Sequence, residues 1–193
     1  MASLRNSAQE AHLDAAREVI LDLGWRRTTL TEVAKRAWVS RMTIYRHWED
    51  RERLLADLLT REWALILEKT SVPSQDDDSL TGFVQFLLDS VAGLHRSQLL
   101  RRIIELDPEL LLPYILQRAG RSQKALLVLL VPRIQRVQAS GQMRGGDPEV
   151  LARSLLLMLE GLLLSADTMK TRSVSRAKLA AAYQDILMSG LAP

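Results

Sequence analysis

The chain has 193 residues, of which 47% are hydrophobic and 25% are charged, a balance that favours a folded globular protein over a disordered one. It contains no cysteine, which excludes disulfides, thiolate metal sites and a cysteine nucleophile, and its formal net charge is +3. Because its first residues lack the apolar core of a signal peptide, and its longest apolar runs (125–131 and 155–164) are shorter than the roughly 20 residues that span a membrane, we expect a cytoplasmic protein.

Helical periodicity is visible along almost the whole chain, whereas the alternating pattern of β-strands is not found. A first helix is predicted at about residues 8–23, with its apolar side chains on one stripe: Leu13, Ala16, Ile20 and Leu23. Gly24 follows directly, and glycine tolerates the left-handed backbone that commonly ends a helix. The sequence therefore predicts an all-α chain whose first helix ends at this glycine.

Two short helices are predicted next, joined by a turn of two residues. Thr29, followed three residues later by Glu32, forms a capping box that begins the first of them. Ser40 is the predicted N-cap of the second, at about residues 41–48. Because only residues 38–39 lie between them, the two helices must cross steeply, as they do in a helix-turn-helix.

The second of these short helices has an apolar side and a polar side. Ile44 and Trp48, four residues apart, are expected to face the core. The outward positions are Arg41, Met42, Thr43, Tyr45, Arg46 and His47. Their guanidinium, hydroxyl, phenol and imidazole groups are donors that reach phosphate oxygens and base edges in a major groove. Residues 26–53 carry eight basic and four acidic side chains, and this local net charge of +4 suits phosphates, although a solvated helix surface also explains it.

The rest of the chain is predicted as a leucine-rich set of helices. Asp50 caps a fourth helix, and a run of proline, serine and aspartate predicts a linker at about 71–78. Further helices are predicted at about 79–95, 97–106, 109–119, 121–139, 148–168 and 175–189. Pro108 and Pro148 suit the first turn of a helix, whereas Pro132 lies inside a helical pattern and predicts a kink or break there.

The helix predicted at 148–168 is apolar on most of its faces, so it must be covered on all sides. The chain's own helices can cover one side, and a partner subunit is a natural cover for the other. Gly161 would permit a close approach of the two backbones. A purely intramolecular core is the alternative.

Residues 13–59 resemble, in register and without gaps, the DNA-binding domain of the TetR (tetracycline-repressor-like) family of transcriptional regulators. The matching pieces are Gly24-Trp25, Thr28-Thr29, Val33-Ala34, Ala37-x-Val39-Ser40, Thr43-Ile44-Tyr45-x-His47-Trp48 and Arg51 before Leu54. The resemblance implies a three-helix DNA-binding domain over 1–52, with its helix-turn-helix at about 29–48. It also implies a helical ligand-binding and dimerisation domain over 53–193.

The resemblance further implies which residues contact DNA. They are Thr28, Thr29, Ser40, Arg41, Met42, Thr43, Tyr45, Arg46, His47 and Arg51. Within this set, Arg41, Met42 and Arg46 match positions where base contacts vary between members. Two departures from the family pattern stand out. Arg51 replaces the usual lysine and keeps its charge. Trp38 stands where glycine is common, and it would be strained by about 1 kcal/mol or more if it keeps the left-handed backbone.

By the same resemblance, the chain is expected to form a homodimer through its last two helices on a near-palindromic double-stranded operator. A small-molecule ligand in the C-terminal domain would then release the DNA, and the leucine-rich surroundings favour an apolar one. Candidate pocket residues are His95, Tyr114, Gln117 and Met158. We expect no cofactor, no membrane partner and no metal site, since the three histidines show no helical i, i+4 pairing.

Two other classes of function also fit an all-helical chain. A dimeric enzyme is disfavoured because the sequence has no phosphate loop, dinucleotide fingerprint, nucleophile elbow or metal-ligand helix, so we assign no catalytic residue. A protein-interaction module that has lost DNA binding would be favoured if Trp38 distorts the turn before the polar helix.

Overall fold

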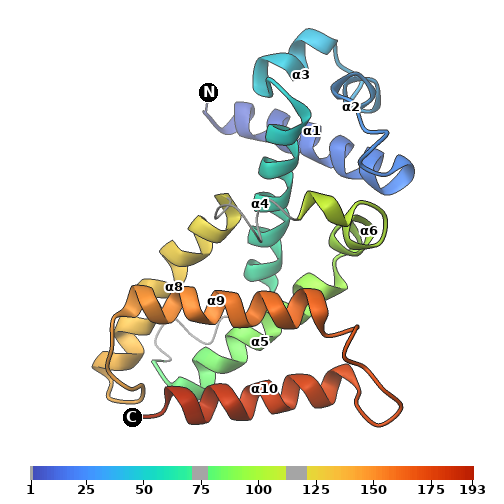
Figure 1. Ribbon diagram of the computed structural model, residues 1–193. Helices are drawn as coiled ribbons and strands as arrows, with labels where there is room; N and C mark the ends of the chain where they lie inside the picture. Colours follow the sequence, from blue (N-terminus) through green and yellow to red (C-terminus); the bar gives the residue numbers. More distant parts are fainter. Residues whose placement is uncertain (1, 71–77, 112–120) are drawn as a thin grey trace. The chain divides into compact units, whose positions relative to one another are not determined.

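The computed structural model describes residues 2–70, 78–111 and 121–193, and every regular element in these ranges is helical (Figure 1). In chain order the elements are α1 (Ala2–Leu23), α2 (Leu30–Arg36), α3 (Arg41–His47), α4 (Arg51–Lys69), α5 (Leu80–Arg96), α6 (Gln98–Leu106), the 3₁₀ helix η1 (Pro108–Leu110), α8 (Arg121–Ala139), α9 (Pro148–Ser165) and α10 (Arg176–Leu191). The predicted all-α fold is confirmed. No described helix combines the length and hydropathy that crossing a bilayer demands.

The chain folds into two compact units. The first comprises Met1–Trp63 and Ser97–Ser122, and the second comprises Ala64–Arg96 and Gln123–Pro193. The long helix α4 begins in the first unit and ends in the second, while α6 belongs wholly to the first. The domain boundary expected between residues 52 and 53 stays a prediction.

The first unit is built around one apolar cluster. Its fully or almost fully buried members include Ala16, Val19 and Ile20 of α1, Val33 and Ala34 of α2, Ile44 of α3 and its C-cap Trp48, Leu54 and Leu58 of α4, and Leu99 and Ile103 of α6. In Figure 1, α2 and α3 cross each other beside α1, and α2 packs against both. The inward orientation predicted for Ile44 and Trp48 is confirmed.

The predicted starts of the short helices are confirmed by their side-chain caps. The Thr29 hydroxyl accepts a hydrogen bond from the Glu32 amide at 3.1 Å, and the Ser40 hydroxyl accepts one from the Thr43 amide at 3.2 Å. At the start of α4, Asp50 Oδ1 accepts from the Arg53 amide at 2.7 Å. Each cap satisfies a backbone N–H that has no partner inside its own helix.

The turn between α2 and α3 keeps a left-handed residue although that residue is tryptophan. Trp38 has φ 57°, and its amide donates to Lys35 O at 3.1 Å, while the Val39 amide donates to Ala34 O at 3.0 Å. These two bonds form a Schellman motif, in which the position of Trp38 is usually glycine. The backbone of the helix-turn-helix is therefore intact, and the condition that would favour a module without DNA binding is not met.

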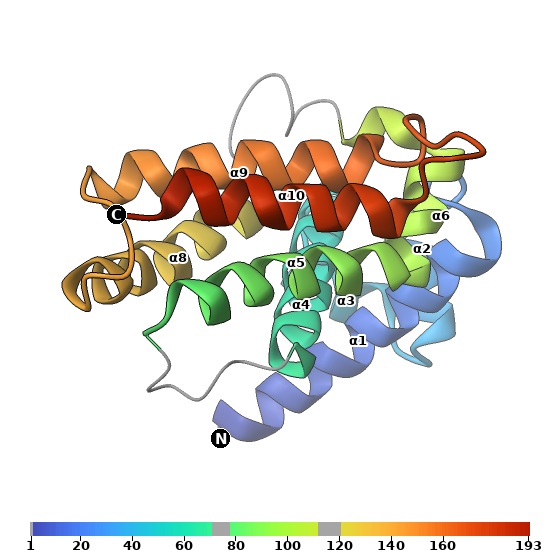
Figure 2. The same cartoon turned by 90° about the horizontal axis from the view of Figure 1, so that it is seen from below.

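In the second unit, α5 packs against both α9 and α10, which run in opposite directions (Figure 2). Its core is aliphatic and aromatic, with Phe83, Ile134 and Leu155 among its buried side chains. Pro148 lies in the first turn of α9, and Pro108 lies in the first turn of η1 in the first unit, as predicted.

Of the kink or break predicted at Pro132, the break is wrong, because α8 runs without interruption from Arg121 to Ala139, and the kink stays a prediction. Proline lacks an N–H, so the carbonyl four residues earlier, on Val128, loses its helical partner. Pro132 and Val128 are both exposed, with 77% of Val128 accessible. Solvent can therefore satisfy that carbonyl, and the helix tolerates the proline.

Two further expectations fall on residues that the structure does not describe. Residues 71–77 of the predicted linker lie outside the described ranges. So do residues 112–120, which make up most of the helix expected at 109–119; the described start of that segment is the 3₁₀ helix η1.

Candidate nucleic-acid interface

The orientation of α3 is fixed from behind by two residues four positions apart. Ile44 is 0% exposed and Trp48 is 1% exposed, so both lie in the apolar cluster. The Trp48 indole Nε1 also donates to Asp57 Oδ2 of α4 at 2.9 Å. Burial and this hydrogen bond together determine which face of α3 is presented to solvent.

That outward face carries most of the residues predicted to contact DNA. Arg41, Met42, Tyr45, Arg46 and His47 are all exposed. Met42 is 75% exposed and Tyr45 is 49% exposed, which is unusual for side chains of this size. The Ser40 and Thr43 hydroxyls lie 2.9 Å apart at the start of the helix. Five large side chains on two turns of helix are thus exposed.

Ion pairing inside the chain leaves positive charge mainly on this face. Five of the eight basic residues in 26–53 pair with carboxylates: Arg26, Lys35, Arg36, Arg51 and Arg53. The other three, Arg27, Arg41 and Arg46, make no ion pair with any described residue, and two of them lie on α3. The positive charge of residues 26–53 that has no carboxylate partner among the described residues therefore lies mainly on α3.

The ion pairs of Arg26 and Arg36 also contain hydrogen bonds. A hydrogen bond from Arg26 to Glu109 at 2.8 Å raises the pKa of Arg26 and lowers the pKa of Glu109, because it favours the charged form of each. Hydrogen bonds to Asp22 and then Glu18 raise the pKa of Arg36 in the same way. Each of these two arginines is thus paired with a carboxylate of the same chain.

Arg51 is held in place rather than freely extended. Its guanidinium carbon lies 4.9 Å from the centre of a Trp25 ring, and Nη1 donates to Thr28 O at 3.4 Å. Its Nε donates to Glu52 at 3.2 Å, and 38% of the side chain stays exposed. A cation on an aromatic face with its outer edge in solvent is pre-oriented for a phosphate oxygen.

His47 has a neighbour that sequence reasoning missed. The ring of His12, in α1, lies 5.5 Å from the His47 ring and 6.2 Å from the Trp48 ring. His12 is 5% exposed, and its Nδ1 has no hydrogen-bond partner among the described residues. Burial, and then the charge of His47, lower the pKa of His12. The spacing of His12 four residues before the buried Ala16 would have indicated this inward position.

Thr28 differs from the other predicted DNA contacts. Its side chain is 0% exposed, and its hydroxyl donates to Gly24 O at 2.8 Å. This burial argues against the predicted contact with DNA, because the hydroxyl is used to close the loop between α1 and α2. The neighbouring Thr29 is exposed and caps α2.

The predicted ligand-pocket residues are only partly described. His95 lies on α5, with Nε2 3.6 Å from Asp167 Oδ2, and Met158 lies on α9 with 37% of its surface exposed. Hydrogen bonds from Arg176 and then Lys170 lower the pKa of Asp167 to about 2. Tyr114 and Gln117 lie outside the described residues.

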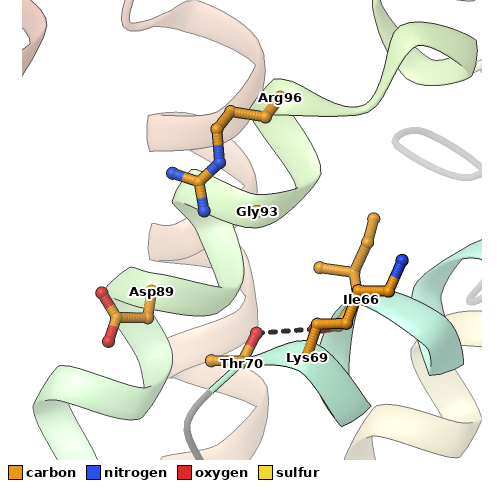
Figure 3. Close-up of a pocket in the computed structure, with 6 residues that line it drawn as sticks. All are labelled: Ile66, Lys69, Thr70, Asp89, Gly93 and Arg96. Carbon is orange, nitrogen blue, oxygen red and sulfur yellow. Dashed lines mark hydrogen bonds between the residues drawn. The ribbon is translucent and has the colours of Figure 1, made fainter.

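An open cleft of about 280 Å³ lies elsewhere in the second unit, between the end of α4 and α5 (Figure 3). Asp89, Gly93 and Arg96 of α5 line one side of it. Ile66, Lys69 and Thr70 line the other, and the Thr70 hydroxyl donates to Ile66 O at 2.8 Å. Neither His95 nor Met158 is among the described residues that line this cleft, and the predicted pocket stays a prediction.

Comparisons with known proteins agree on one family. Residues 13–58 match the model described as bacterial regulatory proteins, tetR family. An uncharacterized HTH-type transcriptional regulator of Mycobacterium bovis is 35% identical over 155 residues, which cover 80% of this chain and 79% of that protein. Among solved structures, the R. erythropolis transcriptional repressor QsdR from the TetR family superposes with a TM-score of 0.69 at 16% identity over 95% of both chains. SmeT, the repressor of the Stenotrophomonas maltophilia multidrug efflux pump SmeDEF, gives 0.65 at 22% identity over 96% of this chain and 90% of its own.

Proposed function

The chain belongs to the tetR family of bacterial regulatory proteins and is a helix-turn-helix transcriptional regulator, and we propose that it is a repressor which a small-molecule ligand releases from its operator. The outward face of α3 carries the DNA-binding part of this proposal. There, Arg41 and Arg46 have no carboxylate partner among the described residues, and Met42 and Tyr45 are exposed beside them. An exposed set of donors and apolar groups on a rigidly held helix is suited to a major groove.

The roles of individual side chains follow from their position and chemistry. Arg41, Met42 and Arg46 read base edges, since a guanidinium pairs with guanine and an apolar group contacts the thymine methyl. Thr29, Ser40, Thr43, Tyr45, His47 and Arg51 contact the sugar–phosphate backbone and set the register of the helix. The cap hydrogen bond of Thr29 leaves its hydroxyl proton for this second use. The hydroxyl pair of Ser40 and Thr43 uses one of its two protons and leaves the other.

A homodimer through α9 and α10 is the second part of the proposal, and exposed apolar side chains on these two helices support it. Val150 is 58% exposed and Leu157 is 72% exposed on α9, and Ile186 is 57% exposed on α10. A Cβ at Gly161 would meet nothing within 4 Å, so the backbone there is open to a second copy. Burying each such aliphatic side chain stabilises a dimer by roughly 1.5–3 kcal/mol. Two copies would present two α3 helices to a near-palindromic operator.

Repression and release by ligand are the third part. The similar structures QsdR and SmeT are both named as repressors, which favours repression here. The ligand would bind among the leucine-rich helices of the predicted C-terminal domain, for which His95, Tyr114, Gln117 and Met158 are the candidate residues, and an apolar compound suits such surroundings. Release requires that the ligand bind more tightly to a dimer whose α3 helices are wrongly spaced for the operator.

A DNA titration tests this function. The purified protein is titrated onto a labelled duplex from the region upstream of its own gene, at several salt concentrations, with unrelated DNA alongside. We expect a preference of about a thousandfold or more for the specific duplex, and an affinity that falls steeply with salt.

Variants make the titration specific to α3. Arg41→Ala and Tyr45→Ala should each weaken specific binding by about tenfold or more without unfolding the protein, because each removes a contact with the operator. Arg136→Ala is the matched control, since Arg136 pairs with Asp78 in the second unit and should not matter for DNA. Unchanged affinity in both α3 variants would contradict the assignment of α3 as the reading helix.

A further inference from the structure

Trp38 combines two features that a fold normally avoids. Its side chain is 94% exposed, more than any other large apolar side chain in the described ranges. It is also the one non-glycine residue with positive φ there, at 57°. An L side chain in this conformation crowds its own backbone, and an exposed indole gains nothing from burial.

The fold itself needs the backbone of Trp38 but not its indole. The Schellman hydrogen bonds at this turn use only the main-chain atoms of residues 34, 35, 38 and 39. Glycine would make the same bonds without strain. Within the described residues, the indole makes neither a hydrogen bond nor a ring contact. The fold therefore does not account for this side chain, whereas a binding partner outside the chain would.

The position of Trp38 along the chain indicates what kind of partner its indole meets. Trp38 lies two residues before Ser40, the N-cap of α3, and three before Arg41. In a helix-turn-helix, the second helix enters the major groove and the first helix crosses the sugar–phosphate backbone. The turn that joins them therefore lies at the rim of the groove, next to that backbone. The exposed surface of Trp38 is thus continuous along the chain with the face that carries Arg41 and Met42.

We propose that Trp38 is a further DNA contact, whose indole packs on the sugar–phosphate backbone beside the groove that α3 enters. This inference rests on the proposed function of α3. The chemistry fits: the ring covers the apolar face of a deoxyribose, and its N–H is a donor for a phosphate oxygen. The contact adds area and orientation at a site where most members of the family, having glycine, offer no side chain.

A series of substitutions separates the side chain from the backbone strain. Trp38→Gly and Trp38→Ala both remove the indole, but only glycine relieves the positive φ. Trp38→Phe keeps an aromatic ring and keeps the strain. We expect the alanine and glycine variants to bind the specific duplex about tenfold more weakly, and the phenylalanine variant to stay within about threefold of the original. Thermal stability should rise only in Trp38→Gly.

Two measurements identify the contact directly. Because the indole is uncharged, Trp38→Ala should lower affinity without changing the slope of log Kd against log salt, whereas Arg41→Ala should make that slope shallower. Acrylamide quenching of tryptophan fluorescence should fall when the specific duplex is added. Trp25 and Trp48, at 3% and 1% exposure, are already shielded. Trp63 of α4 is partly exposed, and its quenching should be the same with and without DNA, so the protection should vanish in Trp38→Phe.

The outcomes that overturn the inference differ from those that overturn the function. If Arg41→Ala weakens binding but Trp38→Ala and Trp38→Gly do not, Trp38 is not a DNA contact and α3 still is. If Trp38→Gly and Trp38→Ala differ in affinity in the same order as they differ in stability, the geometry of the turn affects DNA binding and the indole does not. If acrylamide protection appears with rising protein concentration and no DNA, the indole contacts a second protein copy instead. Failure of Arg41→Ala itself would count against the proposed function.

Discussion

His12, in α1, is a buried histidine whose protonation affects the stability of the unit that carries α3. Its ring is buried beside the His47 and Trp48 rings, and the Trp48 indole in turn donates to Asp57 of α4. Burial first, and the charge of His47 second, lower the pKa of His12 below the ordinary value of 6.5. The unfolded chain therefore binds this proton more readily than the folded protein does, so protonation favours unfolding.

The predicted pH dependence follows from that sign. The contribution of neutral His12 to the free energy of unfolding should be fully present above pH 6.5 and should be lost as the pH falls from there toward the lowered pKa. His12→Leu should flatten this part of the stability curve, measured by thermal unfolding from about pH 5 to pH 8. His47→Gln, which removes only the smaller charge effect, should flatten it less. Equal slopes in all three proteins would show that His12 is not the responsible group.

Gly93 is a residue of α5 whose backbone lies close to a side chain near the end of α4. A Cβ added there would lie 2.7 Å from Cγ2 of Ile66, a methyl attached directly to a β-branched carbon that cannot easily turn away. We expect Gly93→Ala to destabilise the protein by about 1–3 kcal/mol in chemical denaturation, because the two helices must separate. Combining it with Ile66→Ala should recover part of that loss. Gly145→Ala, where a Cβ meets nothing within 4 Å, is the control, and a cost as large there would refute the steric explanation.

At the scale of elements, the segment after α6 closes the loop between α1 and α2. The Trp25 amide donates to Asp107 Oδ2 at 3.0 Å, and Asp107 is 3% exposed. Arg26 pairs with both Asp107, at 3.4 Å, and the more exposed Glu109, at 2.8 Å. A buried carboxylate that caps a backbone amide matters more than a solvent-exposed ion pair, even though both belong to one cluster.

These two acidic residues therefore make a matched test. Asp107→Ala should lower the free energy of unfolding by about 1–3 kcal/mol, since it leaves the Trp25 amide without its partner. Glu109→Ala should change stability little, because solvent screens its interaction with Arg26. Denaturant unfolding of both variants measures the difference, and a larger loss for Glu109→Ala would mean that the exposed pair, not the buried cap, holds the loop.

For the whole molecule, the exposed apolar residues of α9 and α10 predict assembly. Leu157→Glu should shift the protein from dimer to monomer in analytical ultracentrifugation, because a carboxylate would be buried at the interface without a partner. Val128→Glu is the control: Val128 is 77% exposed but lies on α8, outside the proposed interface. A monomer produced by Val128→Glu and not by Leu157→Glu would move the interface to α8.

Loss of the dimer should also weaken operator binding, since two linked α3 helices bind one duplex more tightly than either alone. Leu157→Glu is therefore expected to bind DNA poorly although its α3 is intact. If a monomeric Leu157→Glu variant bound the operator with the original affinity, this would contradict the proposal that two α3 helices bind one operator.

The sequence by itself determined the helices of the first unit and the face that α3 presents. Thr29 and Ser40 cap α2 and α3 through residues three positions away, and Ile44 and Trp48 share an inward stripe through helical spacing alone. Such features depend on neighbours within one turn of helix, so they can be read from the order of residues. The resemblance to a known family was visible for the same reason, since its motif lies within one short segment.

Only the tertiary structure decided which of these side chains are available. Thr28 turned inward to Gly24, and Pro132 was tolerated because its side of α8 is exposed. Trp25 received its cap from Asp107, 82 residues away, and ion pairs with distant carboxylates left Arg41 without a partner among the described residues while occupying Arg36. Burial and charge pairing depend on groups that are brought together only when the chain folds, and local sequence patterns carry no record of them.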